Sequence, residues 1–165
     1  MPYTVDDVQR LFNLLGQAVW YTQHLELVIT QYNSLMTLQQ GQEPDTRISE
    51  DHVKKTLSTE KTQTLEPLFI SMKAQGSLPD RLEERFKFFL KTRSWILHDC
   101  VYDNHLSFKE PKSQQFFFGL LEEYIKEAKA LKAEIFKEME AWLKANGYDL
   151  ARVYPLAGDL PKDME

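Results

Sequence analysis

Residues 91–102 of this chain read KTRSWILHDCVY, and they place an arginine and a histidine inside an otherwise ordinary helical pattern. At about 100° of rotation per residue, Arg93 falls in the middle of an apolar arc. The residues that form this arc are Leu82, Phe86, Phe89, Leu90, Ile96, Leu97 and Cys100. A guanidinium group is almost never fully buried without a partner, so packing alone does not explain Arg93.

His98 follows Arg93 by five residues and, in an α-helix, points about 140° away from it. The face of the helix that carries His98 is polar, basic and aromatic. It includes Lys87, Lys91 and Ser94, and it is flanked by Phe88, Trp95 and Tyr102. The two sides of this helix therefore indicate a structural core on one face and a candidate functional surface on the other.

The order of Arg93, a polar residue, three further residues and His98 resembles the Arg-polar-x(3–5)-His motif of the HEPN family. This family consists of small helical-bundle proteins, many of which are metal-independent ribonucleases. The polar residue is most often Asn in the family, whereas Ser94 stands here. One branch, paired with nucleotidyltransferases, carries a tyrosine two residues after the histidine; Cys100 occupies that position, so the chemistry of that branch is not implied.

The resemblance implies that Arg93 and His98 are the catalytic residues, with Ser94 in a supporting role, in a composite site at a homodimer interface. Histidine suits proton transfer to or from a ribose oxygen because its pKa lies near neutrality. Arginine suits the phosphate because its fixed fork of donors matches two phosphate oxygens. One histidine and one arginine make an incomplete set for cleavage without a metal, and two copies across a two-fold axis would double it.

The neighbouring residues suggest how single-stranded RNA would reach this site. Lys87 and Lys91 could attract the RNA backbone, and Trp95 and Tyr102 could stack on unpaired bases. The alternative interpretation of these four residues is a solvated helix edge whose aromatic rings pack against the neighbouring helix, and for Trp95 this packing role is favoured.

Glu26 is the unusual residue of the first long helical pattern, because rotation places it with Val8, Leu15 and Val19 on the side expected to be buried. Two interpretations remain open. Glu26 lies at the edge of the stripe and reaches water, or it pairs with Arg93 and supports the site.

Composition favours one soluble domain without a membrane span. The chain has 165 residues, of which 42% are hydrophobic, enough for one continuous core. Its formal net charge of -5 argues against a general nucleic-acid coat but allows a small basic site. A single cysteine excludes an intramolecular disulfide and fits a reducing compartment. No signal peptide and no apolar run of about 20 residues is visible, so we expect a cytoplasmic protein.

The hydrophobic periodicity predicts helices along the whole chain. A long helix is expected from Thr4 to about Gln40, a loop over residues 40–48, and short helices that begin after Ser49 and Thr64. Another begins near Pro79 and carries the Arg93–His98 segment, and the last runs from about Ser113 to Asn146. The apolar face predicted for the first helix comprises Val8, Leu11, Phe12, Leu15, Val19, Leu25, Ile29, Tyr32 and Met36.

These patterns predict an all-α fold, an HEPN-like antiparallel up-and-down bundle of four to five helices over residues 1–147, with an irregular tail over residues 148–165. We expect no metal and no cofactor, because His98, Asp99, Asp103 and His105 match no ligand spacing. The function favoured is a metal-independent endoribonuclease that acts as a homodimer. The alternative is a non-catalytic HEPN-like module that binds a protein or nucleotide; the sequence identifies no protein partner or antitoxin.

Overall fold

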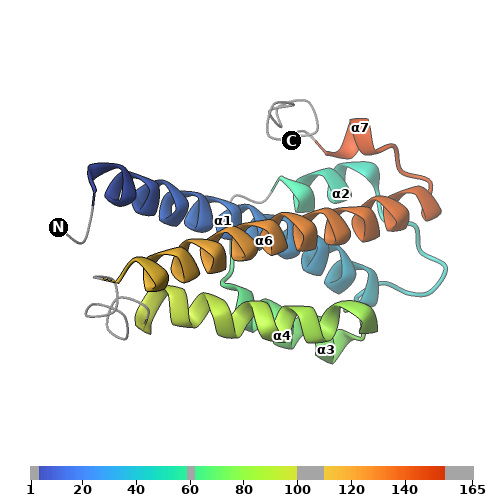
Figure 1. Ribbon diagram of the computed structural model, residues 1–165. Helices are drawn as coiled ribbons and strands as arrows, with labels where there is room; N and C mark the ends of the chain where they lie inside the picture. Colours follow the sequence, from blue (N-terminus) through green and yellow to red (C-terminus); the bar gives the residue numbers. More distant parts are fainter. Residues whose placement is uncertain (1–3, 59–61, 100–109, 155–165) are drawn as a thin grey trace. The chain divides into compact units, whose positions relative to one another are not determined.

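The computed structural model describes residues 4–58, 62–99 and 110–154, and every regular element among them is helical. The elements are α1 (Val5–Gln40), α2 (Glu50–Leu57), α3 (Leu65–Gln75), α4 (Asp80–Ser94), the π-helical turn η1 (Trp95–Asp99), α6 (Pro111–Ala145) and α7 (Leu150–Val153), as Figure 1 shows. The prediction of an all-α fold is confirmed, and the described residues hold six α-helices where four to five were expected. None of the described helices combines the length and the apolar character that crossing a membrane requires.

Local sequence signals account for several helix ends. Before α1, the Thr4 amide donates to Asp7 Oδ2 at 3.0 Å while the Asp7 amide donates to Thr4 Oγ1 at 3.1 Å, a reciprocal capping box. Ser49 caps α2 by accepting from the His52 amide. Gly76 follows α3 and Gly147 follows α6, both with positive φ, the left-handed conformation in which glycine commonly ends a helix.

The chain divides into two compact units, and both long helices contribute to each. Unit 1 comprises Met1–Leu25 and Leu78–Lys132, and unit 2 comprises Glu26–Ser77 and Ala133–Glu165. The expectation of a single domain over residues 1–147 stays a prediction.

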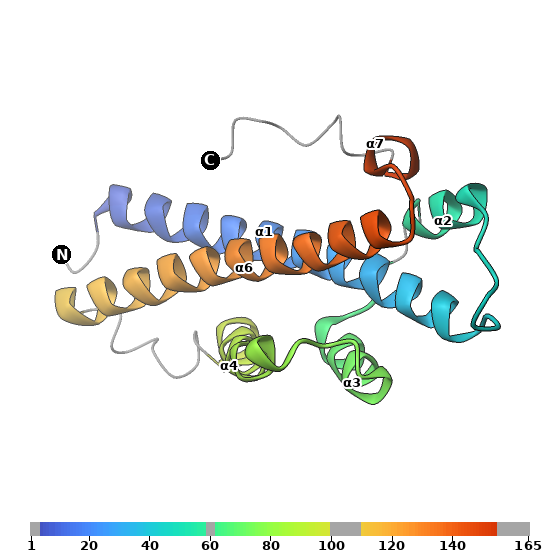
Figure 2. The ribbon, with the colours of Figure 1, turned by 90° about the vertical axis from the view of Figure 1, so that its right-hand side faces the viewer.

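Unit 1 contains the first part of α1, α4 with η1, and the first part of α6. Arg10 of α1 pairs with Glu122 of α6 at 2.7 Å, and further along both helices Thr22 Oγ1 shares a hydrogen bond of 2.7 Å with the hydroxyl of Tyr124. Contacts that advance together along both helices mean that α1 and α6 run parallel, and the two helices lie side by side in both views (Figures 1 and 2). The core of this unit includes Leu14, Ala18, Leu25, Leu82, Phe86, Phe89, Phe118, Leu121 and Leu131.

Unit 2 contains the second parts of α1 and α6 together with α2, α3 and α7. Buried polar groups of α1 connect it to its neighbours: Gln31 Nε2 donates to Leu57 O at 2.8 Å and Gln31 Oε1 accepts from the Tyr154 hydroxyl at 3.0 Å. Ser71 of α3 donates to Asn33 Oδ1 at 3.2 Å. These bonds satisfy groups whose burial would otherwise destabilise the fold.

The expected irregular segment after residue 147 is wrong for its first part. Residues 150–153 form α7, capped by Asp149, and Val153 and Tyr154 are buried. The Tyr154 ring meets Phe136 edge to face, with centroids 5.6 Å apart. The short helix forms because its apolar side chains are buried within unit 2. Residues 155–165 lie outside the described part of the chain.

The predicted apolar face of α1 is only partly the core. Leu25, Ile29, Tyr32 and Met36 are buried, and Leu11 and Leu15 are half-buried. Val8, Phe12 and Val19 are instead exposed, at 42%, 69% and 44%. The buried stripe of the first half of α1 is Leu14, Ala18, Tyr21 and Leu25. Both stripes have helical spacing, which is why periodicity alone did not separate them.

Candidate functional site

The Arg93–His98 segment lies at the end of α4, in unit 1, where contacts with α6 hold the helix in place. Phe89 stacks on Tyr124 with ring centroids 4.5 Å apart, and Arg85 makes a two-pronged ion pair with Glu127, at 2.7 and 3.1 Å. Residues later in α4 contact residues earlier in α6, so the two helices run in opposite senses. Figure 2, where α4 is seen almost end on, shows that they cross at an angle.

The α-helix changes to a π-helical turn within the motif itself. Arg93 and Ser94 are the last residues of α4, and η1 comprises Trp95–Asp99. A turn with i→i+5 hydrogen bonds accommodates more residues than the 3.6 of an α-turn, so each residue rotates by less than 100°. The angle between Arg93 and His98 is therefore smaller than the predicted value of about 140°, which assumed an uninterrupted α-helix.

The two motif residues differ in exposure. Arg93 is half-buried, on the side of α4 that carries the buried Phe86 and Phe89, as the apolar arc predicts. His98 and Ser94 are exposed. The segment thus presents a partly desolvated cation and, five residues later, an accessible imidazole.

The arc around Arg93 is less complete than predicted. Ile96 is buried, but Leu97 is 47% exposed, in the last described turn of the segment. Cys100, also expected in the arc, lies outside the described residues, as does Tyr102.

The face of α4 that carries His98 has less unmatched positive charge than the sequence suggested. The Lys87 ammonium pairs with Glu83 at 3.0 Å and with Glu84 at 2.7 Å. Hydrogen bonds to Glu84 and then Glu83 raise the pKa of Lys87, so its charge is kept but largely matched by carboxylates of its own helix. Lys91 is exposed.

Trp95 has the packing role that the sequence favoured. Its ring is half-buried and meets Phe117 of α6 edge to face, with centroids 6.0 Å apart. The contact attaches η1 to the first turns of α6, so Trp95 helps to position the segment.

Glu26 is buried, at 9% exposure, so the interpretation that it reaches water at a helix edge is wrong. It belongs to unit 2 and Arg93 to unit 1, so their pairing stays a prediction.

A groove beside α4 was missed by the sequence analysis. It has a volume of about 450 Å³ and is lined from α4 by Arg85, Phe88, Phe89 and Thr92, and from α6 by Leu120, Glu123, Tyr124, Lys126, Glu127 and Ala130. Phe88 is 67% exposed while Phe89 is buried. The signal was present in the sequence, because the predicted apolar arc of this helix included Phe89, whereas rotation of about 100° per residue placed Phe88 outside it.

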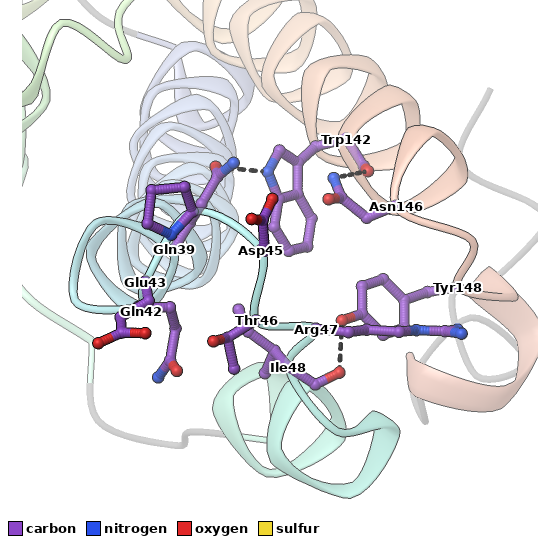
Figure 3. A pocket seen from close by; sticks show the side chains of 11 residues that line it. Gln39, Gln42, Glu43, Asp45, Thr46, Arg47, Ile48, Trp142, Asn146 and Tyr148 are labelled. Carbon is purple, nitrogen blue, oxygen red and sulfur yellow. Dashed lines mark hydrogen bonds between the residues drawn. The ribbon is translucent and has the colours of Figure 1, made fainter.

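A second unanticipated cavity, of about 350 Å³, lies in unit 2 between the loop after α1 and the end of α6 (Figure 3). Trp142 Nε1 donates to Gln39 Oε1 at 2.7 Å, and the Trp142 ring stacks on Tyr148. The Arg47 guanidinium lies over the Tyr148 ring and donates to Gly147 O at 3.3 Å. These contacts order the loop, and the cavity walls carry no histidine.

In the part of the chain that the structure describes, no group of three or more His, Cys, Asp or Glu side chains is arranged to hold a metal ion.

In the comparisons with known proteins, the chain matches no family model, no curated protein and no solved structure.

Proposed function

We propose that this chain is a metal-independent endoribonuclease of HEPN type, with a composite active site formed by two copies of an HEPN-like bundle. The observation that carries the proposal is the position of η1, the π-helical turn within the described residues, inside the Arg93–His98 motif. π-Turns are rare, at well under 1% of residues, and occur frequently at functional sites. The single cysteine suits the reducing cytoplasm in which we expect the enzyme to act.

The exposure of the two residues supports their proposed roles. Arg93 is half-buried, so its guanidinium is partly desolvated, and a phosphate oxygen would bind it more strongly than in open water. His98 is exposed and therefore accessible to the ribose 2′-hydroxyl or to the leaving oxygen. With a second copy, one histidine would accept a proton while the other donates one.

The test is cleavage of single-stranded RNA by the purified chain in EDTA. His98→Ala should lower the rate about 10²–10⁴-fold, the usual contribution of a general acid or base. Arg93→Ala should lower it too, with Arg93→Lys failing to restore it fully because an ammonium cannot form the two-pronged contact.

His52→Ala is the matched control, because His52 is an exposed histidine on α2 in the other unit. Its cleavage rate should equal that of the wild type. Equal cleavage by a folded His98→Ala protein would assign the activity to another site or to a contaminant.

The second candidate is a non-catalytic helical module, and the ion pairs of Lys87 favour it. A surface whose lysine is matched by two neighbouring carboxylates attracts an RNA backbone less than an unpaired lysine would. Absence of wild-type cleavage on every single-stranded RNA would select this candidate.

A further inference from the structure

The first half of α1 carries a second apolar stripe that is not part of the core. We call it the exposed stripe: Val5, Val8, Phe12, Leu15 and Val19. Val5 is 82% exposed and Phe12 69% exposed, and only Leu15 is half-buried. A continuous apolar surface of this kind on a water-exposed helix usually marks an interaction site.

The spacing of the exposed stripe indicates that its partner is another helix. The steps along it are three, four, three and four residues, the a/d repeat whose side chains pack into the holes of a facing helix. The stripe extends over two heptads, about 21 Å of helix at 1.5 Å per residue.

The charges on α1 favour a second copy of this chain as that partner. Between Val5 and Val19 the charged residues are Asp6, Asp7 and Arg10, and helical rotation places all three away from the exposed stripe. Arg10 instead pairs with Glu122 and lies over the Phe118 ring, 4.5 Å from its centroid. A neutral stripe meets its own copy without like-charge repulsion. It also lacks the lysines and arginines that accompany helices lying on membrane surfaces.

The two ends of the stripe are symmetric about Phe12, whereas Leu15 has Gln9 as its mirror position. Val5 and Val19 each lie seven residues from Phe12, and Val8 and Gly16 each lie four residues from it. In an antiparallel pair with a two-fold axis at Phe12, Val5 meets Val19 of the other copy and Val8 meets Gly16. Gly16 is exposed, and apart from its own helix backbone no heavy atom lies within 4 Å of the position that a Cβ would take. The space beside it is open to a partner's side chain.

We propose that two copies of the chain associate through the exposed stripe, as antiparallel α1 helices related by a two-fold axis at Phe12. The interface is isologous, because both copies use the same surface: where a residue of one copy contacts a second residue of the other, the reciprocal contact also forms. The inference rests on the proposed function in that it names the contact surface of the two-copy enzyme, but its evidence lies outside the Arg93–His98 segment.

The first test compares the molar mass of the full chain in solution, by light scattering over a concentration series, for wild type and variants. Wild type should have the mass of two chains. Phe12→Arg places two cations at the two-fold axis and should raise the dissociation constant about 30-fold or more, as the loss of a central interface residue does. Val5→Arg, at an even more exposed position, should also raise the dissociation constant. A weaker dimer in both variants would show that the effect does not come from a folding defect of Phe12→Arg.

Ile70→Arg is the control, because Ile70 is a 61% exposed apolar residue of α3 in unit 2. It should keep the mass of two chains. A wild type that remains a single chain at all concentrations, or a Phe12→Arg dimer as tight as the wild type, would overturn the proposal.

The second test determines the orientation by disulfide formation in a Cys100→Ser background, which removes the native cysteine. The antiparallel pair places residue 5 opposite residue 19, so Val5→Cys with Val19→Cys should cross-link the two chains. Val5→Cys alone should not, because its symmetry mate lies about 21 Å away along the axis and a disulfide requires Cα atoms within about 7 Å. Efficient cross-linking of Val5→Cys alone would overturn the antiparallel arrangement.

The two proposals can fail separately. If the chain associates through the exposed stripe but cleaves no RNA, the proposed ribonuclease activity is contradicted and the proposed interface stands. If cleavage depends on His98 but Phe12→Arg leaves the dimer intact, the proposed interface is contradicted and the ribonuclease activity stands.

Discussion

His24 and Lys132 form a pair of neighbouring basic groups in unit 1. Burial lowers the pKa of His24, and the positive charge of Lys132 lowers it further. The imidazole ring lies on Trp20, with centroids 4.6 Å apart, and burial also lowers the pKa of Lys132. Each group therefore holds its proton less firmly in the folded chain than in water.

Replacing Lys132 with Gln should raise the pKa of His24 toward its ordinary value of about 6.5, because one of its two causes of depression is removed. Titration of the imidazole by NMR would measure this. Lys129→Gln is the control, since the Lys129 ammonium lies over the Tyr21 ring, 4.4 Å from its centroid. An identical pKa for His24 in wild type and Lys132→Gln would contradict the coupling.

The lowered pKa of His24 also determines how this residue changes the stability of the fold with pH. Between the lowered folded-state pKa and the unfolded-state value of about 6.5, the unfolded chain binds more protons. The free energy of unfolding therefore rises with pH through that window, and His24 destabilises the fold increasingly as the pH falls through it.

At the scale of single elements, the sequence predicts helix ends better than helix interiors. Thr4, Ser49, Gly76 and Gly147 each stand where the structure places a helix end, because capping depends on residues within a few positions. The π-helical turn could not be predicted in this way. Trp95–Asp99 contains no glycine or proline, and rotation at a constant 100° assumes the regular helix that η1 interrupts.

Gly147 offers a test of one such end. Its φ of 76° is unfavourable for a side chain, although an added Cβ would come no closer than 3.7 Å to Arg47 Nη2. Gly147→Ala should therefore destabilise the fold by about 1–2 kcal/mol through its backbone conformation alone. Gly119→Ala, inside α6 with open space around it, should stabilise by about 0.5–1 kcal/mol. Urea unfolding of both variants would measure the difference, and equal signs would contradict this explanation.

At the scale of the whole molecule, periodicity predicted the two long helices, but not which stripe of α1 faces the core. Val8, Phe12 and Val19 have the same helical spacing as Leu14, Ala18 and Leu25. Only tertiary contacts distinguish them. The same holds for α7, whose four residues are too few to form a helix without the packing of Val153.

Gly16→Ala separates the stability of the chain from its assembly. Alanine in a helix interior should stabilise the single chain by about 0.5–1 kcal/mol relative to glycine. The added methyl would occupy the space proposed for Val8 of the other copy, so association should weaken at the same time. Unfolding experiments at protein concentrations below the dissociation constant would measure the stability of the single chain. Sedimentation over concentrations on both sides of the dissociation constant would measure the association. Gly119→Ala is the control, and a Gly16→Ala chain that associates more tightly would contradict the proposed interface.

The long separation of α1 and α6 along the chain has a consequence for how the protein folds. Arg10 and Glu122 are 112 residues apart in the sequence, and Gln39 and Trp142 are 103 apart. Contacts between such distant segments raise the contact order and slow folding, because a large loop must close before the contact forms. At about 5–20 residues per second on the ribosome, α1 emerges roughly 5–20 s before its partner helix. During that interval both of its apolar stripes face water, which makes the nascent chain a natural client for chaperones.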